Sequence, residues 1–301
     1  MKYGNREICD VVFKANAETT IGSTTFKKGQ PVFYFDTLKT SSLEGASTTV
    51  YATGGKGNAR LIAWCGDRTL TLNMQDAVIS PVTLSILAGA GLYDTTGEKG
   101  KGNAKDISVH CSGRFAYDSA TKSIVVKTEG AKQIDETQPI YFAEVDDEGN
   151  LKALTLGNPT AETGNITITE VSQIGSKITF KENIIQGANT KYIFVDCYVK
   201  YAAAEGNTGG MFEIDITPEI QSANFYIEGT TLWRDLNGKD HPAEIIIPNG
   251  RVQSNFTISM ASTGDPAVYD FVIDAFPGYI VGDVSHKVLS AIQVYDEKYN
   301  D

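Results

Sequence analysis

Hydrophobic and polar residues alternate in residues 68–75, RTLTLNMQ, as they do in a β-strand with one buried face. The apolar side of this expected strand consists of Leu70, Leu72 and Met74. The opposite side consists of Thr69, Thr71, Asn73 and Gln75, which are all uncharged. Solvent-facing strands often carry charges that discourage pairing with other strands. The alternation therefore predicts a strand whose polar face has an unusual neighbour.

Further runs rich in Val, Ile, Thr, Tyr and Phe, separated by Gly, Asn and Asp, predict a mainly β protein. The expected strands are 8–14, 31–36, 60–65, 68–75, 107–111, 123–128, 139–144, 165–171, 177–182, 191–201, 211–216, 223–233, 243–248, 251–260 and 267–275. The Asn237-Gly238 pair between two apolar runs predicts a tight hairpin turn.

One helix is expected at 81–89, directly after the opening strand. Ser80 is a suitable N-cap. Pro81 is suited to the first helical position, where a backbone N–H would have no partner within the helix. Gly91 is suited to a left-handed stop. The residues expected to pack this helix onto the sheet are Val82, Ile86 and Leu87. A weaker helical pattern covers 286–293.

The expected strand at 251–260 repeats the opening pattern. Its apolar face includes Val252, Phe256 and Ile258. Its polar face consists of Gln253, Asn255, Thr257 and Ser259. Two separate strands with the same uncharged polar face indicate a shared environment rather than an accident of composition.

Two glycine-rich runs, 53–60 and 96–105, share the fragment KGNA followed by a basic residue. Neither has the spacing of a phosphate-binding loop, so basic surface loops are the simpler interpretation. Their basic residues are Lys56, Arg60, Lys99, Lys101 and Lys105. We expect these residues to meet acidic neighbours in an assembly.

Composition narrows the possible functions. The chain has 301 residues, 41% of them hydrophobic, and a formal charge of −11. This acidity disfavours tight binding of DNA or RNA, which depends on Lys and Arg meeting phosphate. No signal peptide or membrane helix is expected, because no long apolar stretch occurs. The four cysteines are scattered singly, which indicates packed thiols rather than a metal site.

No catalytic motif emerges, so we expect neither enzymatic activity nor a cofactor or metal. His110 and Cys111 are adjacent on a strand and so point to opposite faces. Residues 146–148 lack the spacing of a calcium loop and are typical of a turn. Asp270 and Asp274 share a strand face without a partner acid, base or metal ligand.

Domain boundaries are weakly marked. Residues 116–190 contain acidic turns and short strands, and are expected to form an inserted β-subdomain. The remaining segments, 1–115 and 191–301, are then expected to form the core of the protein.

Residues 61–92, together with 251–277, resemble the tail tube (major tail) proteins of tailed bacteriophages. The family is related to the tubes of contractile injection systems. With the adjoining strands of 211–250, the resemblance covers less than half of the chain, and 116–190 has no counterpart. It implies an antiparallel β-sandwich or split barrel with one flanking α-helix. Such subunits form rings, usually of six copies, in which their sheets join into one β-barrel.

The resemblance also implies a virion protein of the tail, assembled in the host cytoplasm, whose stacked rings let phage DNA pass without binding it specifically. The expected partners are other copies of the chain, with tail sheath, baseplate and tape-measure proteins as candidates, and no membrane. A channel wall for DNA needs a wet surface without basic residues, because lysine and arginine would hold phosphate. The residues expected to face the channel are Thr69, Thr71, Asn73, Gln75, Gln253, Asn255, Thr257 and Ser259. The basic residues of the two glycine-rich runs are expected to contact acidic residues of the next ring or of a sheath.

Three alternatives remain open. The first is another virion component, such as a baseplate or capsid decoration protein. The second is a β-sandwich binding module. A hydrolase with a dispersed site is the third, and loss of activity on substitution of Asp270 or Asp274 would support it. Hollow tubes or six-fold rings in electron micrographs would distinguish a tube protein from all three.

Overall fold

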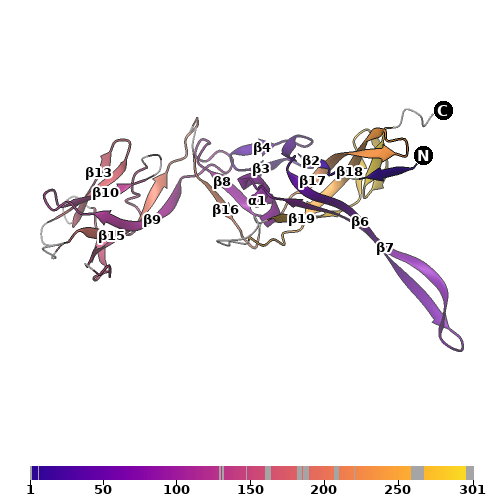
Figure 1. Cartoon of the computed structure of the whole chain (residues 1–301), viewed down its shortest axis with the longest axis horizontal. Helices are drawn as coiled ribbons and strands as arrows, with labels where there is room; N and C mark the ends of the chain where they lie inside the picture. The colour runs from indigo at the N-terminus through magenta and orange to yellow at the C-terminus, as the bar shows by residue number, and fades with distance from the viewer. Residues whose placement is uncertain are drawn as a thin grey trace. The chain divides into compact units, whose positions relative to one another are not determined.

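A computed structural model describes residues 2–5, 7–128, 130, 132–146, 148–159, 164–181, 185, 190–206, 210–219, 221–258 and 268–295. The described residues form antiparallel β-sheets and one helix, which confirms the mainly β class (Figure 1). The chain divides into two compact units. The first unit comprises residues 1–93 and 213–301, and the second comprises 94–212.

A nine-stranded sheet forms most of the first unit, with the strand order β5-β2-β17-β18-β19-β7-β6. These strands are β2 (Asp10–Ala15), β5 (Pro31–Phe35), β6 (Leu38–Gly54), β7 (Ala59–Asp76), β17 (Asn224–Asp235), β18 (Asp240–Val252) and β19 (Tyr269–Ala275). Two short strands complete it: β1 (Tyr3–Asn5) pairs with β17, and β22 (Ala291–Val294) pairs with β18. The Asn237-Gly238 turn joins β17 to β18, as the sequence predicts.

Smaller two-stranded pairs accompany this sheet. They are β3 (Thr19–Ile21) with β4 (Thr24–Phe26), β8 (Gly91–Asp94) with β16 (Phe212–Asp215), and β20 (Gly278–Ile280) with β21 (Asp283–Val288). The helix expected at 286–293 is wrong. Residues up to Val288 belong to β21, and Ala291 begins β22, whose ladder with β18 outweighs local helical propensity.

The helix α1 (Pro81–Ala88) confirms the expected start. The Ser80 side chain accepts a hydrogen bond from the Thr83 backbone N–H at 3.1 Å, and Thr83 Oγ1 accepts one from the Ser80 N–H at 2.8 Å. The helix stops at Gly89, two residues before the expected Gly91, in a left-handed conformation with φ 59°. The N–H groups of Gly89 and Ala90 then bond the carbonyls of the last turn, so no further residue is needed.

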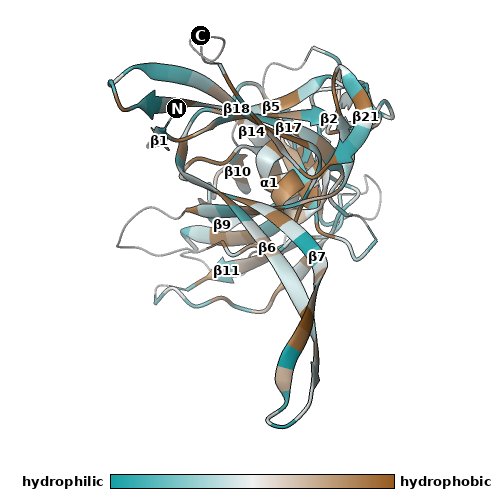
Figure 2. Ribbon diagram, turned by 90° about the vertical axis from the view of Figure 1, so that its right-hand side faces the viewer, coloured by the Kyte–Doolittle hydropathy of each residue, from teal (hydrophilic) through white to brown (hydrophobic). Residues whose placement is uncertain are grey.

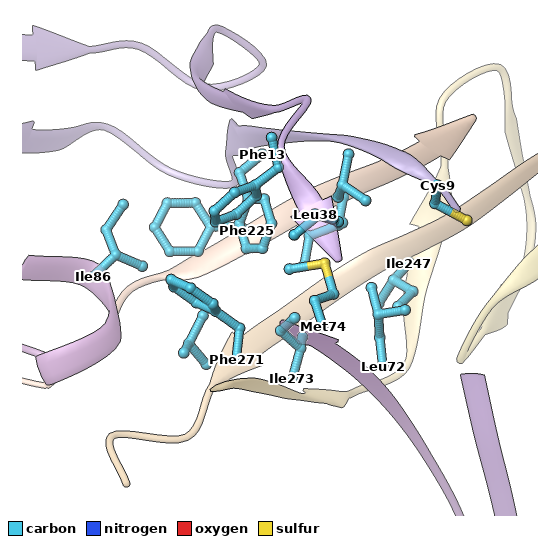
Figure 3. Close-up of a cluster of buried hydrophobic side chains, with 14 of the residues drawn as sticks. Cys9, Phe13, Leu38, Leu72, Met74, Ile86, Phe225, Ile247, Phe271 and Ile273 are labelled. Carbon is cyan, nitrogen blue, oxygen red and sulfur yellow. The ribbon is translucent and has the colours of Figure 1, made fainter. Parts of the chain in front are cut away.

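The core of the first unit lies between α1 and one face of the sheet (Figure 3). Ile86 and Leu87 are buried in it, and Val82 packs against it. Phe13 and Phe271 come from β2 and β19, and Phe35 contacts both rings at centroid distances of 5.6 and 5.0 Å. The helix thus occupies the apolar side of the strand that precedes it.

The second unit contains two small sheets that share a second core. The four-stranded sheet has the order β12-β11-β15-β9, and the three-stranded sheet has the order β10-β14-β13. Their bounds are β9 (Ile107–Ala116), β10 (Ser123–Lys127), β11 (Ile140–Val145), β12 (Thr155–Gly157), β13 (Ile166–Val171), β14 (Gly175–Phe180) and β15 (Tyr192–Tyr201). The expected subdomain, 116–190, leaves out β9 and β15. These strands pair with each other along their full lengths, and both lie in the second unit.

Candidate functional site

The strand β7 keeps the alternation expected at 68–75. Leu72 and Met74 are buried, with 4% and 1% of their surfaces exposed. Thr71, Asn73 and Gln75, between and beside them, keep part of their surface in solvent, and Thr69 is exposed. The polar side of the strand therefore remains accessible while its apolar side contributes to the core.

The polar side of β7 continues onto both neighbouring strands through the strand register. Opposite Gln75, Asn73 and Thr71 lie the β6 residues Thr40, Ser42 and Glu44. Opposite the same three residues on the other side lie the β19 residues Asp270, Val272 and Asp274. We call these nine residues, with Thr69, the polar face. It carries three carboxylates and no lysine or arginine.

Hydrogen bonds run across the polar face. Thr40 Oγ1 donates to Gln75 Oε1 at 3.1 Å, and Gln75 Nε2 donates to Asp270 Oδ1 at 2.7 Å. At the next strand, Arg251 lies opposite Asp274 and donates to Gln221. The Gln75 amide is thus held between a hydroxyl and a carboxylate group.

The second expected strand face is only partly present. The strand β18 ends at Val252, so the expected strand 251–260 is wrong for 253–258, and residues 259 and 260 lie outside the described residues. The chain leaves the sheet after Gln253, whose N–H donates to the Val272 carbonyl at 2.8 Å, and it passes the end of α1 at Gly89.

Gln253 still borders the polar face, because its Nε2 donates to Asp274 Oδ1 and Oδ2 at 3.0 and 2.9 Å. Asn255 and Thr257 are exposed, but no strand ladder fixes them to that face. Ser259 lies outside the described residues.

The two basic runs occupy different units. Residues 96–105 lie in the second unit, where Lys99 bonds Asp106 at 2.6 Å and Lys101 bonds Glu98. The Lys99 ammonium, followed by the Ala203 N–H and Lys200, holds the pKa of the Asp106 carboxyl well below its usual range. The Lys105 backbone N–H donates to the Asp94 carbonyl at 3.0 Å. Lys99 and Lys101 are therefore already engaged within their own unit.

The other run, 53–60, forms the tip of the long β6–β7 hairpin rather than a separate loop. Lys56 lies in the turn, where Gly55, Gly57 and Asn58 have positive φ angles of 78°, 85° and 51°. The Arg60 guanidinium lies over the Tyr51 ring, 4.2 Å from its centroid. The sequence predicted the basic tip but not the strand β6, whose polar, weakly alternating residues lack a strand pattern.

The part of this hairpin from Ser47 to Arg68, which we call the hairpin arm, extends from the nine-stranded sheet as a two-stranded ribbon (Figures 1 and 2). The register places Val50 opposite Trp64 and Ala52 opposite Ile62, on one face of the ribbon. Val50, Ile62 and Trp64 are 61%, 55% and 52% exposed. An apolar strip of this kind on a ribbon is typical of an interaction surface.

Within the described residues, no group of three or more His, Cys, Asp or Glu side chains has an arrangement that could hold a metal ion. No helix in the same part of the chain is long and apolar enough to cross a membrane.

The sequence model of the YomU/Tube protein family matches residues 19–111. The matched segment contains β6, β7 and α1, so it includes seven of the ten residues of the polar face and the whole hairpin arm. The match is consistent with a phage tail tube protein and confirms the resemblance noted for residues 61–92. No curated protein sequence matches the chain.

Proposed function

We propose that this chain is the structural subunit of a phage tail tube, in which copies form stacked, six-membered rings around a channel for DNA. The match of residues 19–111 to the tube family supports a structural role in the virion tail. The polar face is the observation that carries the channel assignment. It is accessible, lies on the side of the sheet opposite the core, and crosses three adjacent strands.

The chemistry of the polar face is suited to DNA that slides. Each lysine or arginine in contact with phosphate releases counterions and steepens the salt dependence of binding by about 0.9 logarithmic units. The polar face offers hydroxyl, amide and carboxylate groups instead. Carboxylates repel phosphate, and the Gln75 amide is held by neighbouring side chains. DNA would therefore meet a hydrated wall without a site that retains it.

Ring closure needs free sheet edges. The nine-stranded sheet ends in β5 on one side and β6 on the other. Pairing of such edges between copies would extend the sheet into a barrel and cover backbone groups that would otherwise cause aggregation. The ring would be assembled in the host cytoplasm before it joins the virion. Tail sheath, baseplate and tape-measure proteins are its candidate partners.

Electron microscopy of the purified protein tests the assembly. Hollow tubes or six-fold rings are expected, with Thr71 and Asn73 on the inner wall of the density. A single ring that never stacks would favour a baseplate component instead. Tubes that place Thr71 and Asn73 on the outer surface would refute the channel assignment.

A charge substitution tests the channel wall in phage particles. Asn73→Lys should leave tubes intact but slow DNA release, because every ring would add lysines along the DNA path. The delay should shorten as salt rises. Thr167→Lys, on an exposed position of β13 in the second unit, is the matched control and should behave as the unaltered protein. Equal release by all three proteins would contradict a DNA-facing position for Asn73.

A further inference from the structure

A groove of about 1010 Å³ lies in the first unit, where the chain passes from β1 to β2. Its lining includes alternate residues of the β17–β18 hairpin, among them Thr230, Leu232 and Pro242. Thr230 lies opposite Glu244, and Leu232 lies opposite Pro242, so these side chains share one face of the hairpin. Segments far apart in the sequence close the groove around them.

The groove is acidic. Its lining contains five carboxylates, on Glu7, Asp10, Asp36, Asp240 and Glu244. Arg234 is the one base among the described lining residues, and it is bound to Asp240 through Nε–Oδ1 and Nη2–Oδ2 contacts of 2.6 and 2.7 Å. Four carboxylates thus remain outside that ion pair. We call this site the acidic groove.

Apolar side chains accompany the acidic groups. Ile8, Leu232 and Tyr295 line the acidic groove, and each is exposed to solvent. A small anion would be repelled here, and a small cation would not cover the exposed apolar surface. The site fits a macromolecular segment that carries positive charge beside hydrophobic side chains.

The hairpin arm has that composition. Its tip, TGGKGNAR, contains Lys56 and Arg60 and no carboxylate. Directly behind the tip, Ile62, Trp64 and Val50 form the apolar strip. The arm, with a basic end followed by an apolar face, therefore complements the acidic and apolar groups of the acidic groove.

The tip of the arm is far from the groove of its own chain. Leu38 lines the groove and is also the first residue of β6, which continues into the tip and ends at Gly54. At about 3.3 Å per residue, the intervening strand spans roughly 50 Å. The ladder with β7 keeps this strand extended, so the tip cannot fold back onto the groove.

We propose that the acidic groove of one copy receives the hairpin arm tip of another copy. This inference rests on the proposed function, in which copies of the chain assemble. The two surfaces are different, so the contact is head-to-tail. Contacts of that type form closed rings or open-ended stacks, as a tube requires.

Charge reversal in two variants tests the pairing. Lys56→Glu/Arg60→Glu gives an acidic tip beside the natural groove, and Asp10→Lys/Asp36→Lys/Glu244→Lys gives a basic groove beside the natural tip. Each variant alone should raise the concentration needed for assembly about tenfold or more, since like charges would meet. An equal mixture should assemble nearly as well as the unaltered protein, because each tip then finds an oppositely charged groove.

Matched controls separate this pairing from general charge effects. Lys127→Glu/Lys181→Glu makes the same charge change as the tip variant, but at exposed positions of the second unit, and should leave assembly unchanged. Urea unfolding verifies that each variant is folded. Failure of the mixture to recover, with both variants folded, would overturn the proposal.

Cross-linking locates the contact directly. A photoreactive amino acid at position 56, in tubes made from isotopically heavy and light copies, should give heavy–light links to residues 7–10, 36–38 or 230–244. Tubes that form with links elsewhere, or with none, overturn the groove assignment while the tube function stands. Absence of rings and tubes from the unaltered protein would instead refute the proposed function.

Discussion

Replacement of Ile86 by alanine should destabilise the first unit by about 2–5 kcal/mol, the range found for large-to-alanine changes in protein cores. Ile86 is 5% exposed and lies in the cluster that joins α1 to the sheet (Figure 3). Its removal leaves a cavity beside Leu87, because the surrounding strands are held by their ladders and relax little. Val78→Ala, at a residue 63% exposed just before the helix, is the control and should change stability by less than about 0.5 kcal/mol.

Urea unfolding followed by tryptophan fluorescence is the assay. The chain has two tryptophans, Trp64 and Trp233, and both belong to the first unit. Trp64 is largely exposed, so the change in emission should come mainly from Trp233 in β17. With a urea dependence of about 1–3 kcal/mol per molar, Ile86→Ala should lower the midpoint by roughly 1 M or more. A midpoint shift no larger than that of Val78→Ala would refute the packing of α1 described here.

Two further predictions concern titration and thiol reactivity. The Asp106 pKa is lowered in the folded chain, so its contribution to stability is present above about pH 4, the unfolded value, and is lost as the pH falls. Asp106→Asn should therefore destabilise the second unit at pH 7 but make it less sensitive to acid, as seen by circular dichroism in urea at pH 7 and pH 3. An equal loss of stability with acid in both proteins would contradict this. A maleimide should label exposed Cys65 first and Cys197 last, because burial, then the neighbouring Cys111, raises the pKa of the Cys197 thiol to about 12. Mass spectrometry of the labelled peptides distinguishes the sites, and equal rates would show that the second core opens readily.

Local patterns in the sequence predicted the elements that depend on local physics. The alternation at Leu70, Leu72 and Met74 identified β7, and the Ser80-Pro81 pair identified the start of α1. The Asn-Gly turn likewise identified the β17–β18 hairpin. In each case the structure is determined by residues that are close together in the sequence. These residues either share a buried face or form a hydrogen bond with a nearby backbone group.

Other features depended on contacts between distant segments. The strand β6 contains several hydroxyl residues in succession, and its conformation follows from pairing with β7 rather than from its own pattern. Residues 286–293 have apolar spacing compatible with a helix, yet Ala291 and Ile292 pair with β18. The acidic groove combines segments near residues 7, 36, 234 and 293, so no local pattern indicated it.

Different forces would control the affinity of the hairpin arm for another copy and its choice of groove. A two-stranded ribbon is marginally stable in water on its own, and binding must also immobilise side chains, at about 0.5–1.5 kcal/mol each. Full burial of Val50, Ile62 or Trp64 would return about 1.5–3 kcal/mol for each side chain, which exceeds that cost. Exposed ion pairs contribute only about 0–1 kcal/mol, so Lys56 and Arg60 add little to the affinity. Their effect is on the choice of binding surface, because a contact between like charges costs more free energy than a contact between opposite charges contributes. Truncation of Trp64 should therefore weaken every contact of the arm, whereas reversal of the tip charges should change which groove the arm accepts.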